Sequence, residues 1–231
     1  MSEASAAAPR RVYGNVISPY ARKVYLVLDW KGLDYESIDV LPHAQTDPFT
    51  RISRLGKIPG YTDDQIELSD SSVICDYLES RYPEPPIYPA RPRDRAHALW
   101  IEEYADTHLQ DLVLRGVVLE RLIKPTVRGE PTDQARVDRI LTDLLPRELD
   151  YLEELLSERS PDSPFLVGKK LSIADLAVTT CFINARDADL EPNAETHPRL
   201  ADFVQTMLAL PLFEARARVE ADYMASLSRS A

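Results

Sequence analysis

Glycine is scarce in this chain, with seven in 231 residues. No G-x-G-x-x-G and no G-x-x-x-x-G-K-[ST] segment occurs, so neither of the glycine-rich loops that cradle phosphate groups can be built. We therefore expect no nucleotide cofactor. The four histidines show no metal-ligand spacing with one another, with cysteine or with carboxylates, so we expect no metal site.

Cysteine and long apolar runs are also rare. The two cysteines, Cys75 and Cys181, lie far apart inside helix-like apolar patterns, which is typical of a reduced compartment and of small core residues. No apolar run approaches the roughly 20 residues that a membrane-spanning helix needs, and the start MSEASAAAPRR lacks the apolar segment of a secretory signal. We expect a cytoplasmic protein with no membrane partner.

Basic charge is the third shortage. Lysine and arginine number 27 against 38 acidic residues, which gives a formal net charge of -11. A chain with this balance offers no broad positive field to phosphate backbones, so no nucleic-acid partner is expected. What is present is an apolar fraction of 44%, enough for an ordinary core in one large domain or two small ones.

Proline, in contrast, is concentrated in RYPEPPIYPARPR at residues 81–93, where five prolines forbid a continuous helix or a central strand. Before this stretch, apolar periodicity alternates and predicts a β-α-β-(α)-β-β-α order. After it, every strong period is near 3.6 residues. The sequence thus predicts an α/β domain at 9–82, a linker at 83–92 and an all-helical domain at 93–231.

Several of the expected helices have recognisable ends. In LSIAD, Ser172 can cap a helix while Asp175 reaches back to the Ser172 amide, as in a capping box. In the α/β domain, a helical pattern starts at Pro19 and closes at Gly32. The helical half is expected to hold helices over residues 93–124, 134–158, 173–187 and 199–224, the last of them broken near Pro211.

Local sequence leaves two interpretations open at two helix starts. Ser18-Pro19 is either an N-cap followed by proline at the first helical position or the place of a reactive group. Asp70-Ser71 either simply begins a helix or holds the ammonium and the carboxylate of a ligand. Neither pair decides the question by itself.

Four motifs together resemble the cytosolic glutathione transferase family. They are SPYARKV from Ser18, GKIPGY at 56–61, LSDSSVICDYLESRYPEPPIYP at 68–89 and GKKLSIADL at 168–176. SPYARKV is similar to the Ser/Cys-Pro-aromatic segment of serine-type and omega-like members, so the chain resembles a serine-type, omega-like member of bacterial style. The resemblance is dense in residues 15–89 and thin beyond Asp175. It implies a thioredoxin-like N-terminal domain with a mixed sheet, followed by an all-α domain.

The resemblance implies an enzyme that adds glutathione to a hydrophobic electrophile, with glutathione as cosubstrate. Ser18 would donate a hydrogen bond to the sulfur, and the N-terminus of its helix would help to stabilise the thiolate. Of the other nearby polar groups, Tyr13 is expected to pack in the core. Tyr20 is a candidate for lining the site, and Asn15 for thiol activation.

The resemblance also implies how the tripeptide binds. Ile58 and a cis Pro59 would form the docking edge, while Asp70 meets the ammonium and Ser71 the carboxylate of the γ-glutamyl end. Asp70 is one methylene shorter than the Glu or Gln usual in the family, a departure expected to weaken binding mildly. Lys57, and less so His43, would meet the glycine carboxylate.

The electrophile is expected in a cleft between the domains, lined by the first long helix after the linker. Trp100, Tyr104, His108, Asp111 and Arg115 fall on one side of that helix, and Tyr104, His108 and Arg115 are the candidate contacts. A helix packed on its partner with a solvated edge explains the same pattern. We call these five residues the Tyr104 stripe.

Two other functions stay open. One is an isomerase or lyase that uses glutathione as a recycled cofactor, although the tandem serine-cysteine motif of zeta-like isomerases is absent where SPYA stands. The other is a non-catalytic interaction protein with the same fold, which has no need of an intact thiol-activating group. Family members are typically homodimers, so the resemblance implies a homodimer here.

Overall fold

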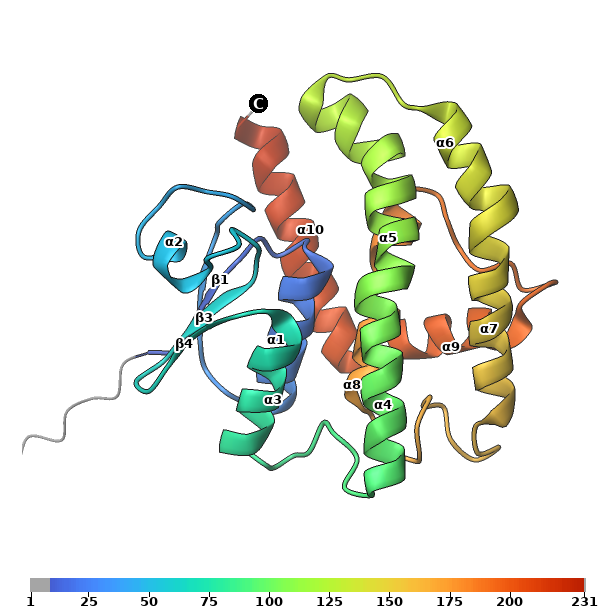
Figure 1. Ribbon diagram of the computed structural model, residues 1–231, viewed down its shortest axis with the longest axis horizontal. Helices are drawn as coiled ribbons and strands as arrows, with labels where there is room; N and C mark the ends of the chain where they lie inside the picture. Colours follow the sequence, from blue (N-terminus) through green and yellow to red (C-terminus); the bar gives the residue numbers. More distant parts are fainter. Residues whose placement is uncertain (1–8, 231) are drawn as a thin grey trace, which may run out of the picture. The chain divides into compact units, whose positions relative to one another are not determined.

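The computed structural model describes residues 9–230, apart from the side chains of residues 187, 224 and 226–230. The chain forms two compact units, one made of the residues up to Pro86 together with those from Pro211 onward, the other of Ile87–Leu210. The first unit contains a four-stranded sheet and the second is helical (Figure 1). The change of unit falls inside the proline-rich stretch 81–93.

The sheet is mixed, as the sequence predicts. Its strands are β1 (Arg11–Tyr13), β2 (Glu36–Ile38), β3 (Gly60–Thr62) and β4 (Glu67–Ser69), in the order β2-β1-β3-β4. β1 pairs with β2 in parallel, while β3 is antiparallel to both β1 and β4. β1 and β4 therefore run in the same direction. The fold class is confirmed as a thioredoxin-like unit with a separate helical unit.

Helices cover both faces of the sheet. α1 (Pro19–Trp30) and α3 (Ser71–Arg81) pack together on one face, and the short α2 (Phe49–Ile52) lies on the other (Figure 1). α2 approaches β3 so closely that a Cβ atom at Gly60 would lie 2.9 Å from Ile52 Cγ2. Ala21 and all of residues 24–28 of α1 are fully buried.

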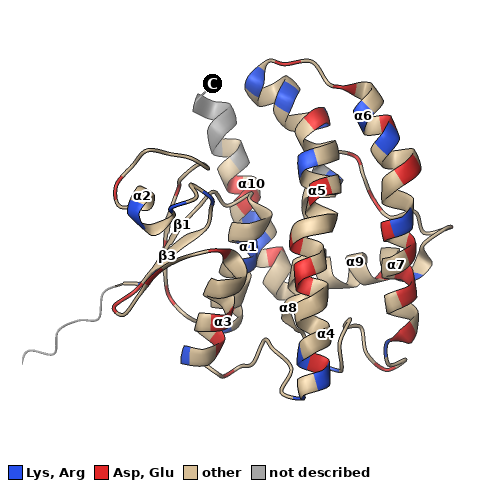
Figure 2. Cartoon of the chain, viewed as in Figure 1, with Lys and Arg blue, Asp and Glu red and all other residues tan. Residues whose placement is uncertain are grey.

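The second unit confirms the expected helical periods. Its first long element consists of α4 (Pro92–Tyr104), η1 (Ala105–Leu109), α5 (Gln110–Leu112) and η2 (Val113–Arg128), where η marks π-helical turns. The next consists of α6 (Gln134–Arg139), η3 (Ile140–Leu144) and α7 (Leu145–Glu158), followed by α8 (Ile173–Asp187) and α9 (Pro198–Leu208). Acidic and basic residues are interspersed along α4 to α7 (Figure 2), so no long single-sign face forms there.

The start of α8 has the reach-back contact that LSIAD predicts. Asp175 accepts hydrogen bonds from the Ser172 amide at 2.8 Å, from the Ser172 hydroxyl at 2.9 Å and from the Leu166 amide at 2.7 Å. The carboxylate is fully buried, and burial raises its pKa from 3.8 to about 6. Asp175 thus ties the loop before α8 to the first turn of that helix.

The last helix differs from the expected domain assignment. α10 (Pro211–Ser230) begins at the proline where the sequence predicts a break, but it packs against α1 and belongs to the first unit. A period of 3.6 residues predicts a helix but does not name its partner, which is why the sequence placed this segment with the helical half. Within the described residues, no helix is both long and apolar enough to cross a membrane.

Candidate functional site

Three of the motifs converge at one end of the sheet. Tyr13, the last residue of β1, pairs with Gly60, the first of β3, and Gly60 pairs with Ser69, the last of β4. SPYARKV follows the first of these residues, GKIP precedes the second, and the acidic-serine pair follows the third. Because paired residues lie side by side across the strands, all three motifs meet at this end of the strands, which we call the Ser18 end of the sheet.

The N-terminus of α1 lies at the Ser18 end. Ser18 has extended backbone angles (φ -70°, ψ 126°), and its Oγ accepts a long hydrogen bond of 3.4 Å from the Ala21 amide. The side chain is half-buried, and no described residue accepts the hydroxyl proton. Ser18 is therefore the N-cap of α1 and also keeps a proton to donate, so the two interpretations of this residue are compatible.

The N-terminus of α3 lies at the same end, because β4 runs in the same direction as β1. Asp70 caps this helix, with Oδ1 accepting hydrogen bonds from the amides of Ser72 (3.0 Å) and Val73 (3.3 Å). Its φ is +86°, an unusual value for a residue other than glycine. Asp70 is exposed and Ser71 is buried. The Ser18 end thus carries two helix N-termini, and both favour negative charge.

The segment between them has the expected backbone. The Ile58–Pro59 peptide bond is cis, Pro59 is buried and Ile58 is half-buried. Within the part of the chain that the structure describes, no hydrogen bond engages the amide or the carbonyl of Ile58. Lys57 is exposed, and its own carbonyl accepts a hydrogen bond from the Ser53 hydroxyl at 2.7 Å. Ile58 therefore offers one backbone donor and one acceptor to a peptide ligand.

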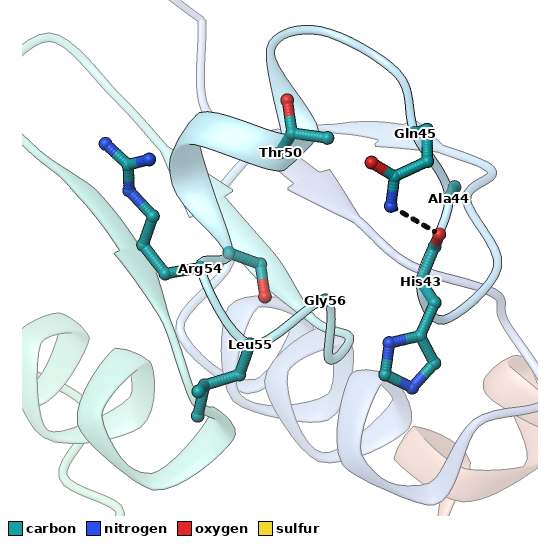
Figure 3. A pocket seen from close by; sticks show the side chains of 8 residues that line it. His43, Ala44, Gln45, Thr50, Arg54, Leu55 and Gly56 are labelled. Carbon is teal, nitrogen blue, oxygen red and sulfur yellow. Dashed lines mark hydrogen bonds between the residues drawn. The ribbon is translucent and has the colours of Figure 1, made fainter.

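A pocket of about 220 Å³ lies between the loop after β2 and the end of α2 (Figure 3). His43 has a φ of +63°, and its amide donates to the Gly56 carbonyl at 2.6 Å. A Cβ atom at Gly56 would lie 2.7 Å from His43 Nδ1, so any larger residue would clash with the imidazole in this position. The pocket is lined by His43, Ala44, Gln45, Thr50, Ser53, Arg54, Leu55 and Gly56.

The His43 imidazole and the Gln45 amide, which donates one of its protons to the His43 carbonyl at 3.0 Å, can donate to a small anionic group, whereas the Arg54 side chain points away from both (Figure 3). His43 lies in this pocket, whereas Lys57 is not among the lining residues. The expectation that Lys57, more than His43, meets the glycine carboxylate stays a prediction. Gln45 and Arg54 were missed, because loop residues without a motif leave no sequence signal.

Two fully buried cations follow Ser18 on α1, and sequence analysis missed both. Arg22 makes a bidentate ion pair with Glu220 of α10, with Nε to Oε1 at 2.6 Å and Nη2 to Oε2 at 2.8 Å. Lys23 donates from Nζ to Ser72 Oγ at 3.0 Å, which links α1 to the first turn of α3. The helical pattern from Pro19 carries no signal that these two polar positions are buried.

The other residues considered near the thiol have different surroundings. Tyr13 is 5% exposed and packs with Val40, Phe49 and Ile52, as predicted. Asn15 is also 5% exposed, and its side chain is engaged in hydrogen bonds within the protein. Tyr20, the second residue of α1, is half-buried. Ser18 is therefore better placed than Tyr13 or Asn15 to meet a sulfur from outside.

The Tyr104 stripe is engaged in contacts within the helical unit. Tyr104 is buried, and its hydroxyl donates to Glu148 Oε2 at 2.7 Å; burial and this bond raise the pKa of Tyr104. His108 is exposed with Nε2 3.0 Å from Glu148 Oε1, and the exposed Arg115 pairs with Asp111 one turn away. These contacts match a helix packed on its partner with a solvated edge, and they leave His108 and Arg115 accessible.

The remaining chemistry-bearing residues are structural. Cys75 and Cys181 are fully buried and form no disulfide, which confirms them as core residues. Among the residues that the structure describes, no three His, Cys, Asp or Glu side chains gather in a way that could hold a metal ion.

The fold and the site define a protein of two units, in which the thioredoxin-like unit presents two helix N-termini and a cis-proline at the Ser18 end of its sheet. Residues 12–86 match the family model described as the N-terminal domain of glutathione S-transferase, and residues 120–215 match the model of its C-terminal domain. The chain belongs to the glutathione S-transferase family.

Curated relatives and solved structures agree. Glutathione S-transferase Z2 of Arabidopsis thaliana is 28% identical over 213 residues, covering 88% of each chain. A probable maleylacetoacetate isomerase of Caenorhabditis elegans is 26% identical over 197 residues, covering 84% of this chain and 86% of its own. The crystal structure of a glutathione S-transferase from Rhodospirillum rubrum superposes with a TM-score of 0.80 at 26% identity, covering 90% of this chain and 91% of that one.

Proposed function

We propose that this protein is a serine-type glutathione transferase in which the glutathione thiolate attacks a hydrophobic electrophile. The observation that carries the proposal is the strand register, which brings Ser18, the cis Ile58–Pro59 bond and Asp70 to one end of the sheet. Ser18 is the catalytic residue. Its hydroxyl proton has no acceptor among the described residues and is available to a ligand sulfur.

Thiolate stabilisation is the chemistry that this arrangement supports. A free cysteine thiol titrates near a pKa of about 8.5, so at neutral pH most of it is protonated and a poor nucleophile. A hydrogen bond from Ser18 and the positive N-terminal end of α1 each favour the anion by about 1 kcal/mol. Together they lower the thiol pKa by roughly one to two units, since one unit corresponds to about 1.4 kcal/mol.

The rest of the tripeptide finds complementary groups at the same end. The free amide and carbonyl of Ile58, beside Pro59, hold the cysteinyl backbone, as in strand addition. Ser71 holds the γ-glutamyl carboxylate, while the exposed Asp70, whose Oδ1 already accepts from the Ser72 and Val73 amides, meets the ammonium. The glycine carboxylate reaches either Lys57 or the pocket that contains His43, and Tyr20 lines the site beside the sulfur.

The electrophile is the least determined partner. His108 and Arg115 are exposed donors that suit an anionic or carbonyl group, and the ring of Tyr104 lies beside His108. We keep all three as candidate contacts. By family likeness we also infer a cytoplasmic homodimer, which size-exclusion chromatography with light scattering would test for the assembly.

The proposal is tested by Ser18→Ala. We expect kcat/KM with an activated aryl halide to fall by at least tenfold, because the thiolate loses its hydrogen-bond donor. Ser80→Ala is the matched control, because it changes an exposed serine near the C-terminal end of α3, and we expect it to keep full activity. Unchanged conjugation in the Ser18 variant would refute the assigned role of Ser18.

A second candidate function rests on the relative described as a probable maleylacetoacetate isomerase. An isomerase or lyase uses the same thiolate but returns glutathione after each turnover. Stoichiometry distinguishes the two functions, because a transferase consumes one glutathione per product whereas an isomerase works at catalytic amounts. Failure to be retained on immobilised glutathione would instead favour the non-catalytic interaction protein.

A further inference from the structure

The last helix is fastened to the thioredoxin-like unit by three polar side chains on one face. Arg216, Glu220 and Tyr223 follow one another at spacings of four and three residues, so they point to the same side of α10. Arg216 donates to Asp29 Oδ2 at 2.5 Å and to the Tyr35 hydroxyl at 2.6 Å, and its guanidinium lies over the Tyr25 ring. Glu220 makes the buried pair with Arg22 described above.

Tyr223 makes the third contact, and it reaches the turn that precedes α1. Its hydroxyl accepts a hydrogen bond from Asn15 Nδ2 at 2.6 Å and donates one to Asp39 Oδ2 at 3.1 Å. Asn15 Nδ2 also donates to Asp39 Oδ1 at 3.0 Å. Tyr223, Asn15 and Asp39 therefore form a closed ring in which both protons of the Asn15 amide are used.

Asn15 in turn accepts hydrogen bonds from Ile17 and Ser18 in the segment 15–18, which we call the Ser18 turn. Its side-chain oxygen accepts from the Ile17 amide at 3.1 Å, and its backbone carbonyl accepts from the Ser18 amide at 3.0 Å. With its two amide protons held by Asp39 and Tyr223, Asn15 has one orientation in which the side-chain oxygen meets Ile17. The direction of the Ser18 side chain depends on this turn, because the backbone angles at residues 15–18 set where Oγ points.

We propose that Tyr223 is a positioning residue for Ser18, acting through Asn15 from the far end of the chain. This inference rests on the proposed function, in which Ser18 donates to the glutathione sulfur. A donor displaced by a fraction of an ångström stabilises the thiolate less, although the tripeptide still binds at Ile58, Asp70 and Ser71. Loss of the Tyr223 hydroxyl thus raises the thiol pKa and lowers kcat, while KM for glutathione stays nearly unchanged.

The fold provides a matched control for the trivial explanation that α10 merely loosens. Tyr35 also supplies one hydroxyl to the fastening of α10, since it accepts from Arg216 and donates to Asp29 Oδ1 at 2.9 Å. It makes no hydrogen bond to the Ser18 turn. Tyr35→Phe therefore weakens the attachment of α10 as Tyr223→Phe does, but leaves the ring around Asn15 intact.

The experiment measures the thiolate absorbance of bound glutathione against pH, together with kcat and KM, in the full-length protein. We expect Y223F to raise the bound thiol pKa by at least half a unit and to lower kcat three- to tenfold, with KM for glutathione within twofold. Y35F should match the wild type in all three quantities. In a Ser18→Ala background, Y223F should have no further effect on the thiol pKa, because the hydroxyl that it positions is gone.

Each of these measurements has an outcome that would contradict the positioning role of Tyr223. Equal effects of Y223F and Y35F, or a Y223F effect that persists undiminished in the Ser18→Ala background, would overturn the positioning role. A bound thiol pKa in Y223F equal to that of the wild type would overturn it as well. If Ser18→Ala still raises the thiol pKa in that case, the positioning role fails but the proposed function survives. If Ser18→Ala has no effect, both proposals fail. Asn15→Asp is a second variant that removes the amide donors and should act in the same direction as Y223F.

Discussion

The two units of the chain hold their candidate functional residues in different ways. At the Ser18 end of the sheet, strand register and helix caps place Ser18, Ile58 and Asp70, so the backbone itself builds the site. In the helical unit, exposed side-chain ion pairs with Glu148 and Asp111 hold His108 and Arg115 on a helix surface. A site built from backbone tolerates sequence change around it, whereas a site built from exposed side chains can change with each substitution. The following predictions test this contrast, from the largest effect to the smallest.

The largest effect is expected where the thioredoxin-like unit is fastened to α10. Glu220→Gln leaves the fully buried Arg22 guanidinium without its counter-charge, and breaking a buried ion pair from one side costs about 3–5 kcal/mol. Urea unfolding would measure this. Glu36→Gln is the control, because its pair with Arg11 is solvent-exposed and such a pair contributes little to stability. Equal losses in the two variants would contradict the account.

In the helical unit the largest effect is pH-dependent and centres on Asp175. Its native pKa of about 6 lies above the unfolded value, so the native state binds the proton more tightly, and stability falls as pH rises from about 4 to about 6. A shift of two units corresponds to about 3 kcal/mol. We expect the unfolding free energy of the wild type to decline across this window relative to Asp175→Asn, measured by urea unfolding at each pH. Parallel profiles would refute the assignment.

A tenfold effect on binding is expected at the second helix N-terminus. Asp70→Asn keeps a good N-cap for α3 but removes the negative charge opposite the ligand ammonium. KM for glutathione should rise about tenfold, or about 1.4 kcal/mol, with kcat little changed. Steady-state kinetics check this split. A fall in kcat at unchanged KM would place Asp70 beside the reacting sulfur and not at the γ-glutamyl end.

The smallest effect on glutathione binding is expected on the Tyr104 stripe. Tyr104→Phe removes a hydroxyl that donates to Glu148, which costs about 1–3 kcal/mol of stability because the carboxylate loses a partner. Binding of glutathione should not change. If the stripe contacts the electrophile, KM for the electrophile changes in this variant and in His108→Gln, and initial rates at saturating glutathione would show it. Rates independent of both substitutions would remove the stripe from the site.

Sequence alone predicted the backbone-built part of the molecule well. The strand and helix order, the caps at Ser18 and Ser172 and the break at Pro211 follow from periodicity and local capping signals, which act over a few residues. The meeting of three motifs at one sheet edge follows once the strands pair, and the resemblance to glutathione transferases pointed to the same edge.

The parts that sequence missed depend on pairs between distant residues. Asn15 and Tyr223 are 208 positions apart, and no local pattern marks either as a partner of the other. The same holds for Arg22 and Glu220, and it explains why α10 was assigned to the helical domain. Apart from Thr50 of α2, the residues that line the pocket with His43 lie in loops, and their positions follow from tertiary contacts and not from a motif.

The central claim is that Ser18 and the α1 N-terminus stabilise a thiolate, and titration of bound glutathione tests it most directly. The account predicts a thiol pKa one to two units below the free value of about 8.5 in the wild type, and a rise of roughly one unit in Ser18→Ala. A bound thiol that titrates near 8.5 in the wild type, or a depressed pKa that survives Ser18→Ala, would contradict it.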